Sequence, residues 1–460
     1  MEQVTRRHFL RTAAQSFGAA SLTSGVFAQV PGDRHPARDK GVTVLNPQGR
    51  VPVSFIIDDS TCLVNLNKFA IPQFAAAWGK KREWRQPWRD WPNEIPDDFV
   101  RKFADWCGEH GVKGKYSVVP YPACVGRLDR VLPGWTAEAL DNSLDLVRKR
   151  LLSDWDIHPE MVTHTWVIDT KTGQPHPERS IRYQENWDWT VGRSADELAD
   201  YMAYALKILK NVGLPCEGIT TPGGFAGRVL PELSRATLES CRDVFKAEVP
   251  HYFRHLYDRG DRSVAPRVEN VSGLDGPDPK CVVSVIGCTG DWTGGWDCSD
   301  RGSVDKFITA DLKSGRLVDV VERGEPACLV CHWTGIYFNG EEVGFKVFQE
   351  AVRRLHKRYD HLLWMKLSEI ARYWAAKELT RIGHADGVVA LDAPFASPRF
   401  TLKVESAGDA APRITTGKEA AALREVSRPL DLKSGTWRRD GRDVVVCFDL
   451  PRGRSQLQVR

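Results

Sequence analysis

Two adjacent carboxylates follow the first apolar strand expected in the chain. Ile56-Ile57 runs directly into Asp58-Asp59, and burying a carboxylate costs free energy unless it is paired, hydrogen-bonded or bound to a metal. Successive side chains of a strand point to opposite sides. One aspartate can therefore hold a metal ion while the other faces a reacting group. A simple turn at the end of the strand is the alternative.

A second group of possible metal ligands lies farther along, where His158, Glu160 and His164 occur within one short segment. In a fully extended strand His158 and His164 would be about 20 Å apart, too far to share an ion. Pro159 makes a continued central strand unfavourable, so we expect the chain to turn there and bring the three side chains together. Imidazole nitrogen and carboxylate oxygen are typical zinc ligands. Surface histidines are the alternative interpretation.

Three further strand ends carry polar or glycine-rich residues. The segment 221–225 (Thr-Pro-Gly-Gly-Phe) follows one expected strand, Asp291-Trp292 follows another, and His332-Trp333 ends a third. Taken singly, each is typical of a turn or of a hydrogen-bonded structural residue. All five segments together indicate one site at the carboxyl ends of parallel strands, where α/β folds place their chemistry.

The order of these segments resembles the polysaccharide deacetylase family, the NodB-homology carbohydrate esterases. The likeness covers about residues 51–377 and lies mainly in the order and cores of the motifs. It implies a distorted (β/α)7 barrel and a divalent metal cofactor, often zinc, that activates water against an acetyl group on a sugar. The substrate would be an N- or O-acetylated polysaccharide.

The resemblance also implies roles for individual residues. Asp59 is similar to the metal-binding carboxylate, Asp58 to the general base and His332 to the general acid. Asp291 and Trp292 resemble the support of that histidine and the wall of the acetyl pocket. The residues expected to contact substrate are Thr221, Pro222, Gly223, Phe225, Trp292 and Trp333.

The metal-binding histidine pair departs from the family pattern, which is His-Ser/Thr-x-x-His. Here His164-Thr165 is followed by Ile168 where the second histidine is expected. The frame Glu160-Met-Val-Thr-His164 keeps the spacing with glutamate in place of the first histidine, and a third frame uses His158 with His164. We expect Asp59, His158 and His164 to bind the metal, with Glu160 as a substitute ligand.

A second departure concerns Thr221, which stands where the family has an arginine that orients the catalytic aspartate; this leaves the tuning of Asp58 open. Two rival functions also stay open. A glycoside hydrolase on a related barrel could use two carboxylates from among Asp58, Asp59 and Asp291. A non-catalytic sugar-binding protein could have kept the barrel and lost its metal.

The elements that position these residues alternate between strands and helices. Some seven strands, each followed by a helix, predict parallel pairing in a βα barrel, with a doubly wound open sheet as the alternative. Thr136 and Ser194-Ala-Asp-Glu197 are typical helix starts. The expected strands include 51–57, 115–119, 218–221, 282–286, 327–330 and 362–365, and the expected helices are 97–110, 136–152, 194–211, 230–245, 304–321, 342–359 and 367–377.

The two ends of the chain differ from this pattern. Arg6-Arg7-His8-Phe9-Leu10, a mildly apolar run and Val26-Phe27-Ala28 predict a twin-arginine export signal over residues 1–28. We therefore expect a periplasmic or secreted protein that uses the twin-arginine export machinery, without a membrane span in the mature chain. Residues 29–48 are expected to be a linker, residues 49–379 the barrel, and residues 380–460 a small β-rich domain.

The composition narrows the classes of protein to which this chain can belong. The chain has 460 residues, of which 42% are hydrophobic and 27% charged, as in globular proteins, and a net charge of +4 that gives nucleic-acid binding little support. Cys328 and Cys331, two of eleven cysteines, fall in an apolar strand, which favours packed thiols over a redox pair. Four of the sixteen tryptophans follow the first strand and could stack on sugar rings or form a lid: Trp78, Trp84, Trp88 and Trp91.

Overall fold

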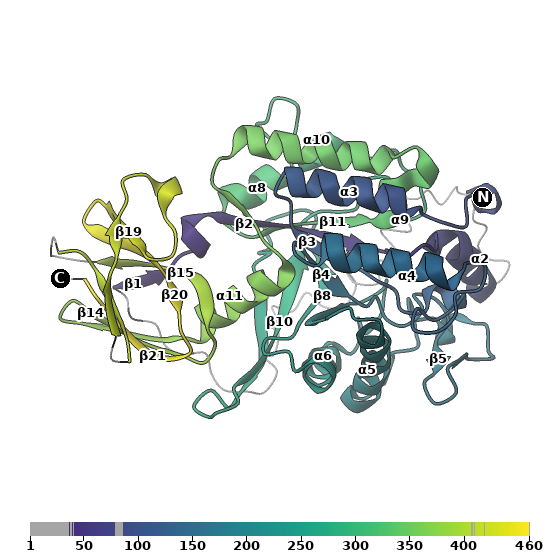
Figure 1. Cartoon of the computed structure of the whole chain (residues 1–460), viewed down its shortest axis with the longest axis horizontal. Helices are drawn as coiled ribbons and strands as arrows, with labels where there is room; N and C mark the ends of the chain where they lie inside the picture. Colours follow the sequence, from purple (N-terminus) through teal and green to yellow (C-terminus); the bar gives the residue numbers. More distant parts are fainter. Residues whose placement is uncertain are drawn as a thin grey trace.

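The computed structural model describes residues 36, 39, 41–78, 86–405, 408, 410–417 and 419–459. The expected signal peptide at residues 1–28 and Trp84 lie outside this part of the chain. Figure 1 shows a mixed α/β part and, at the other end of the molecule, a smaller part built of strands. No helix among the described residues combines the length and apolar character that crossing a membrane requires.

Two sheets form the centre of the α/β part. One has the order β11-β2-β3-β4, with β12 also on β2, and its pairings are parallel. The other has the order β7-β8-β10-β9, in which β9 is the antiparallel member. The strands are β2 (Val51–Asp58), β3 (Gly114–Ser117), β4 (Trp155–His158), β7 (Gly218–Thr220), β8 (His251–Leu256), β9 (Arg267–Ser272), β10 (Lys280–Gly287), β11 (Ala327–His332) and β12 (Leu362–Trp364).

The two sheets approach each other on both sides without a continuous ladder of paired strands. A parallel bridge joins Glu160, just beyond β4, to Thr220 of β7. On the other side the Cys288 N–H donates to the Cys328 carbonyl of β11 at 2.7 Å. The described strands thus form two sheets rather than one closed sheet. The fold is mixed α/β, and closure into the expected (β/α)7 barrel stays a prediction.

Helices pack around these sheets (Figure 1). Thr136 caps α4 by accepting the Ala139 N–H at 3.1 Å, and Ser194 with Glu197 forms the expected capping box of α5. The helices are α2 (Leu66–Trp78), α3 (Asp97–Glu109), α4 (Ala137–Leu146), α5 (Ala195–Asn211), α6 (Leu230–Phe245), α7 (Val304–Phe307), α8 (Arg316–Glu322), α9 (Trp333–Tyr337), α10 (Val343–Arg358) and α11 (Leu367–Leu379).

Two sequence expectations about the elements are wrong. The single helix expected over 304–321 is two short helices, α7 and α8, because the chain is extended at Ile308 and returns to a helix only after Gly315, with Leu312 at a φ of 65° between them. The strands β8 and β9 were not expected. The first of them brings His251 into the interior, where its side chain is fully buried.

The smaller part consists of two five-stranded sheets, β1-β15-β20-β19-β18 and β13-β14-β21-β16-β17. Strand β1 lies within the segment expected to be a linker and pairs antiparallel with β15. Apolar side chains of both sheets share one core with α11. The strands are β1 (Val42–Val44), β13 (Arg381–Ala385), β14 (Val388–Ala393), β15 (Ser397–Glu405), β16 (Arg413–Thr416), β17 (Glu419–Ala422), β18 (Arg424–Glu425), β19 (Thr436–Asp440), β20 (Asp443–Leu450) and β21 (Gly453–Gln458).

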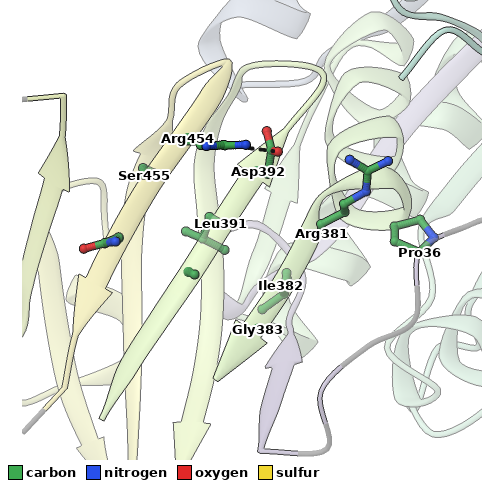
Figure 2. A pocket seen from close by; sticks show the side chains of 10 residues that line it. Pro36, Arg381, Ile382, Gly383, Leu391, Asp392, Arg454 and Ser455 are labelled. Carbon is green, nitrogen blue, oxygen red and sulfur yellow. Dashed lines mark ion pairs between the residues drawn. The ribbon is translucent and has the colours of Figure 1, made fainter. Parts of the chain in front are cut away.

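A surface hollow lies on this smaller part, lined by residues of β13, β14 and β21 together with Pro36 (Figure 2). Arg454 and Asp392 form an ion pair at its edge at 3.8 Å. None of the side chains that the sequence singles out for chemistry lines this hollow. The candidate site therefore has to be sought at the strand ends of the α/β part.

All eleven cysteines are free thiols. Cys328 and Cys331 lie in β11 and are almost fully buried. Burial raises the pKa of both thiols well above its usual value, which keeps them protonated. They are packed core residues, as the apolar strand indicates.

Tyr373 connects α11 to two neighbouring chain segments of one C-terminal sheet, the end of β1 and β15. Its hydroxyl donates to the Leu45 carbonyl at 2.7 Å and accepts the Thr401 N–H at 3.2 Å. We expect Tyr373→Phe to lower the free energy of unfolding by about 1–3 kcal/mol, because two backbone groups lose their partner. Chemical denaturation measures this loss. The control is Tyr183→Phe, whose hydroxyl makes no hydrogen bond within the described residues; an equal loss in both variants would contradict the assignment.

Candidate metal centre and active site

Asp58 and His332 lie side by side at the ends of two neighbouring strands. Asp58 is the last residue of β2 and His332 the last residue of β11, and the parallel register pairs them directly. Carboxyl ends of parallel strands meet at one edge of a sheet. The sheet itself therefore brings the expected general base next to the expected general acid.

The chain turns sharply after β2. Asp59 has a φ of 61°, in the left-handed region that aspartate tolerates better than most residues. Its N–H donates to Oε2 of Glu160 at 2.8 Å, and the Ser117 hydroxyl donates to the same oxygen at 2.8 Å. These two bonds hold one oxygen of the Glu160 carboxylate and leave Oε1 available to another partner.

Asp59, Glu160 and His164 form a compact set of possible ligands. Oδ1 of Asp59 lies 2.7 Å from Nε2 of His164, and Oε1 of Glu160 lies 3.5 Å from the same nitrogen. All three residues are buried. Among the described residues, neither Asp59 oxygen accepts a hydrogen bond of normal geometry, and Nδ1 of His164 has no hydrogen-bond partner. One imidazole and two carboxylates, with ligand atoms within 4.8 Å of one another, fit a divalent cation.

The two buried carboxylates require a positive charge between them. Burial lowers the pKa of His164, but Asp59 and then Glu160 outweigh it and raise that pKa well above its usual value. Burial raises the pKa of Glu160, but the hydrogen bond and charge of His164, followed by the charge of Lys115, lower it to about 2. A protonated imidazole or a bound divalent ion can supply the charge that the cluster needs.

Glu185 and Asn186 hold the turn that carries His164. The Glu185 carboxylate accepts the N–H groups of Thr163 at 3.1 Å and His164 at 2.6 Å, and the Tyr201 hydroxyl donates to it at 2.5 Å. The Asn186 amide donates to the His164 carbonyl at 2.5 Å. His164 has a φ of 64°, so these bonds offset the cost of an unfavourable backbone conformation.

Lys115 of β3 is fully buried, and its ammonium group contacts Asp58. Nζ lies 2.5 Å from Oδ1 of Asp58 and also donates to the Ile57 carbonyl at 2.9 Å and the Ser117 hydroxyl at 2.7 Å. Burial raises the pKa of Asp58 and the charge of Lys115 opposes this, which leaves that pKa at about 6. Lys115 thus places a positively charged side chain beside Asp58. The resemblance in sequence leads us to expect an arginine for this purpose at position 221, which is a threonine here.

Asp291 orients His332. Its Oδ2 lies 2.8 Å from Nδ1 of the imidazole, while its Oδ1 accepts the Thr293 hydroxyl at 2.8 Å. Burial lowers the pKa of His332, but Asp59 and then Asp291 raise it to about 10. Because Nδ1 is occupied by Asp291, the proton on Nε2 is the one available for transfer.

His158 does not join the cluster of Asp59. It ends β4, and its Nε2 lies 2.9 Å from Nε2 of His251 at the start of β8, with Asp156 as the third member of this separate group. The expected ligand set is therefore corrected: Glu160, not His158, accompanies Asp59 and His164. His158 is the last residue of β4, whereas Glu160 lies beyond the strand end, where it bridges to Thr220 of β7.

The loop 221–225 after β7 packs against the turn that carries His164. Gly223 has a φ of 45°, and a Cβ atom there would lie 2.5 Å from Oδ1 of Asn186. The Gly224 N–H donates to the Asn186 carbonyl at 2.8 Å. The loop therefore supports the metal-site turn. The members of the expected substrate loop that are buried are Thr221, Pro222 and Phe225.

Trp333, expected to contact substrate, lies in the core instead. Its side chain is fully buried, and its ring centroid lies 5.1 Å from those of Phe103 and Tyr116. No face of the ring is left for a sugar. Trp292 is half-buried next to Asp291 and packs edge-on against Phe307 at 5.0 Å, so it stays a candidate wall residue.

Aromatic rings from three separate segments border the metal cluster. The Phe74 ring lies 6.3 Å from the His164 ring, and Trp187 and Trp296 pack edge-on against Phe74 at 5.2 Å and 5.8 Å. Trp78 packs edge-on against Trp187 at 5.4 Å. The three tryptophans are half-buried.

Lys115, Ser117 and Glu185 were not singled out from the sequence. Lys115 does carry a signal, because it lies in the strand expected over 115–119, and a lysine in a buried strand needs a partner for its charge. Glu185 carries none, because it lies outside any periodic segment. Its role depends on a turn that only the folded chain defines.

No protein-family model and no curated protein matches this sequence. Among solved structures, a protein named as a polysaccharide deacetylase from Pseudomonas aeruginosa PAO1 aligns with 71% of this chain and 91% of its own, at 10% identity and a TM-score of 0.35. Puue allantoinase aligns over 75% and 94%, at 12% identity and a TM-score of 0.35.

A third solved structure, named as a glycoside hydrolase/deacetylase from Parabacteroides distasonis, aligns over 78% of this chain and 82% of its own, at 10% identity and a TM-score of 0.40. Likenesses of this size carry no argument about what this chain does. The function has to be argued from the site itself.

We expect Glu185→Gln to loosen the His164 turn, because the glutamine amide directs N–H groups where the carboxylate accepts them. Zinc affinity should fall about 10–100-fold, as it does when other groups that orient metal ligands are changed. The free energy of unfolding should fall by about 1–3 kcal/mol. Calorimetric titration of chelator-stripped protein with zinc measures the first change. The control is Glu239→Gln, because Glu239 forms only an exposed ion pair with Arg235 on α6. Unchanged zinc affinity in Glu185→Gln would refute the positioning role.

Proposed function

We propose that this protein is a metal-dependent hydrolase that removes acetyl groups from an acetylated carbohydrate. The observation that carries the proposal is the grouping of Asp59, Glu160 and His164 at ligand distances, with Asp58 and His332 on adjacent strand ends beside it. Three ligands, a base and an acid in one place are the parts that hydrolysis of an acyl bond requires.

The residues divide the chemistry between them. A divalent ion held by Asp59, Glu160 and His164 would lower the pKa of water at the site and polarise the acyl oxygen. Asp58 accepts the proton of the attacking water through the oxygen that Lys115 does not hold. His332, oriented by Asp291, donates the Nε2 proton to the departing sugar nitrogen or oxygen.

A sugar substrate is supported by the aromatic rings beside the cluster. Indole faces stack on the apolar faces of sugar rings, and the half-buried Trp187 and Trp296 lie next to Phe74, which packs near His164. The order of the motifs, which resembles the polysaccharide deacetylases, supports an N- or O-acetyl group as the target. The choice of Trp292 as a wall of the acetyl pocket belongs to the same proposal.

The remaining parts of the proposal extend the sequence expectations. Zinc is the proposed ion, because the ligand set of one imidazole and two carboxylates suits it. The strands are proposed to form a distorted barrel of the NodB type. Export through the twin-arginine machinery, and so a periplasmic or secreted location, is proposed from residues 1–28.

Removal of the metal tests the function directly. We expect chelator-stripped full-length protein to lose release of acetate from an N-acetylated glucosamine oligosaccharide or an O-acetylated xylan oligosaccharide, and zinc to restore it. Asp59→Asn should abolish zinc binding at this cluster together with acetate release. His332→Gln should keep zinc affinity and lower turnover about 10²–10⁴-fold, the usual contribution of a general acid.

The same assay separates the rival functions. New reducing ends in place of acetate would replace the proposal by glycoside hydrolysis. Zinc and sugar binding without either product would replace it by a binding protein. Full activity of the chelator-stripped protein would contradict the metal-dependent mechanism.

Substitution of Lys115 tests whether its charge stabilises the buried Asp58 carboxylate. We expect Lys115→Met to lower the free energy of unfolding by about 3–5 kcal/mol, because the Asp58 carboxylate stays buried without its partner. The double variant Lys115→Met/Asp58→Asn should recover most of that stability and stay inactive. Chemical denaturation and the acetate assay measure the two properties. Lys149→Met, an exposed lysine, is the control, and failure of the second substitution to restore stability would contradict the pairing.

A further inference from the structure

A second group of metal-type side chains lies in the interior of the α/β part. Nε2 of His158 lies 2.9 Å from Nε2 of His251, and Oδ2 of Asp156 lies 4.0 Å from the latter nitrogen. Neither imidazole has any exposed surface. One ligand atom from each of the three residues falls within 4.8 Å of the others. None of the three takes part in the hydrolysis proposed above.

The fold makes room for the two imidazoles at one position. Gly218 of β7 pairs with His251 of β8 in the parallel register. A Cβ atom on Gly218 would lie 2.6 Å from Nε2 of His158 and 2.7 Å from Nε2 of His251. Both distances are shorter than real carbon–nitrogen contacts, so the two ring nitrogens can meet here only because residue 218 lacks a side chain.

Two neutral imidazoles can meet at 2.9 Å in two ways. One ring donates an N–H to the other, or both Nε2 atoms carry lone pairs and a cation lies between them. Nδ1 of His158 lies 3.3 Å from the Thr220 hydroxyl, and Nδ1 of His251 has no hydrogen-bond partner among the described residues. An Nδ1–H donated to that hydroxyl leaves a lone pair on Nε2 of His158. The Asp156 carboxylate brings a third donor atom within 4.8 Å of both nitrogens, which favours the second arrangement.

Asp156 is held in place for a third bond. Its Oδ2 accepts the Ser368 N–H at 2.6 Å and its Oδ1 accepts the Ser368 hydroxyl at 2.8 Å, at the first turn of α11. Lys366 lies 3.8 Å from the same carboxylate. Each carboxylate oxygen has two acceptor positions, so these bonds orient Asp156 and still leave room for a ligand bond.

We propose that Asp156, His158 and His251 bind one divalent transition-metal ion of the zinc class, separate from the ion of the hydrolytic site. Two imidazoles and one carboxylate are a zinc-type ligand set. The ion would link β4, β8 and, through Ser368, the start of α11. Both imidazoles are fully buried and only a small part of the Asp156 side chain is exposed, so the ion would stabilise the fold rather than reach substrate. The proposal does not depend on the hydrolase proposal.

Metal stoichiometry of the full-length protein tests this. Chelator-stripped protein is titrated with zinc and the bound metal is counted by elemental analysis after desalting. We expect two equivalents for the unmodified chain, one for Asp59→Asn/His164→Gln, one for His251→Gln and none for the triple variant. His361→Gln, a half-exposed histidine, is the control and should keep both equivalents.

The zinc stoichiometries of these variants distinguish the interior metal site from the metal site of the proposed hydrolase. If the hydrolytic site binds no metal, the unmodified chain binds one equivalent and His251→Gln none, and the interior site stands. If His251→Gln binds as much zinc as the unmodified chain, the two histidines form only a hydrogen bond and the proposal is overturned.

A second measurement needs no substitution, in case His251→Gln does not fold. Crystals of the unmodified protein grown with zinc should show an anomalous scattering peak between Nε2 of His158 and Nε2 of His251. The same crystals should show the two nitrogens farther apart than 2.9 Å, since two nitrogens bound at about 2.0–2.1 Å in tetrahedral geometry lie more than 3 Å from each other. Absence of the peak overturns the proposal.

Discussion

The concentration of buried carboxylates at one edge of the parallel strands is the constraint on which this structure depends. Each carboxylate would be costly alone, and four of them lie beside a basic side chain. Lys115 pairs with Asp58, His332 with Asp291, and His164 with Asp59 and Glu160. The last pairing is the least balanced, since one imidazole faces two carboxylates, and that imbalance is what makes a divalent ion fit there.

The supporting residues explain how such a cluster keeps its shape. Asp59 and His164 both adopt positive φ values, so the backbone at the ligands is held by its surroundings rather than by its own preference. Glu185 and Asn186 bind the backbone around His164, and Gly223 lets the neighbouring loop approach Asn186 closely. The ligands are thus oriented by residues that have no part in the chemistry.

Helix α11 connects this interior to the C-terminal sheets. Ser368 at its start binds the Asp156 carboxylate, and Tyr373 in its middle bonds to Leu45 and Thr401 of the β-sheet part. Apolar side chains of α11 lie in one core with both C-terminal sheets. The smaller part therefore packs against the helix that orients one wall of the interior, which gives the appended strands a structural role.

The sequence by itself determined the local features: the strand that ends at Asp58 and the helix starts at Thr136 and Ser194. These follow from periodicity and capping, which act over a few residues. Only the tertiary structure placed Glu160, and not His158, beside Asp59 and His164. It also buried Trp333 and brought Lys115 to Asp58. Such choices depend on which strands become neighbours and on the direction of a turn. The unexpected strand β8 shows the same limit, because its His251 gains a partner only across the sheet.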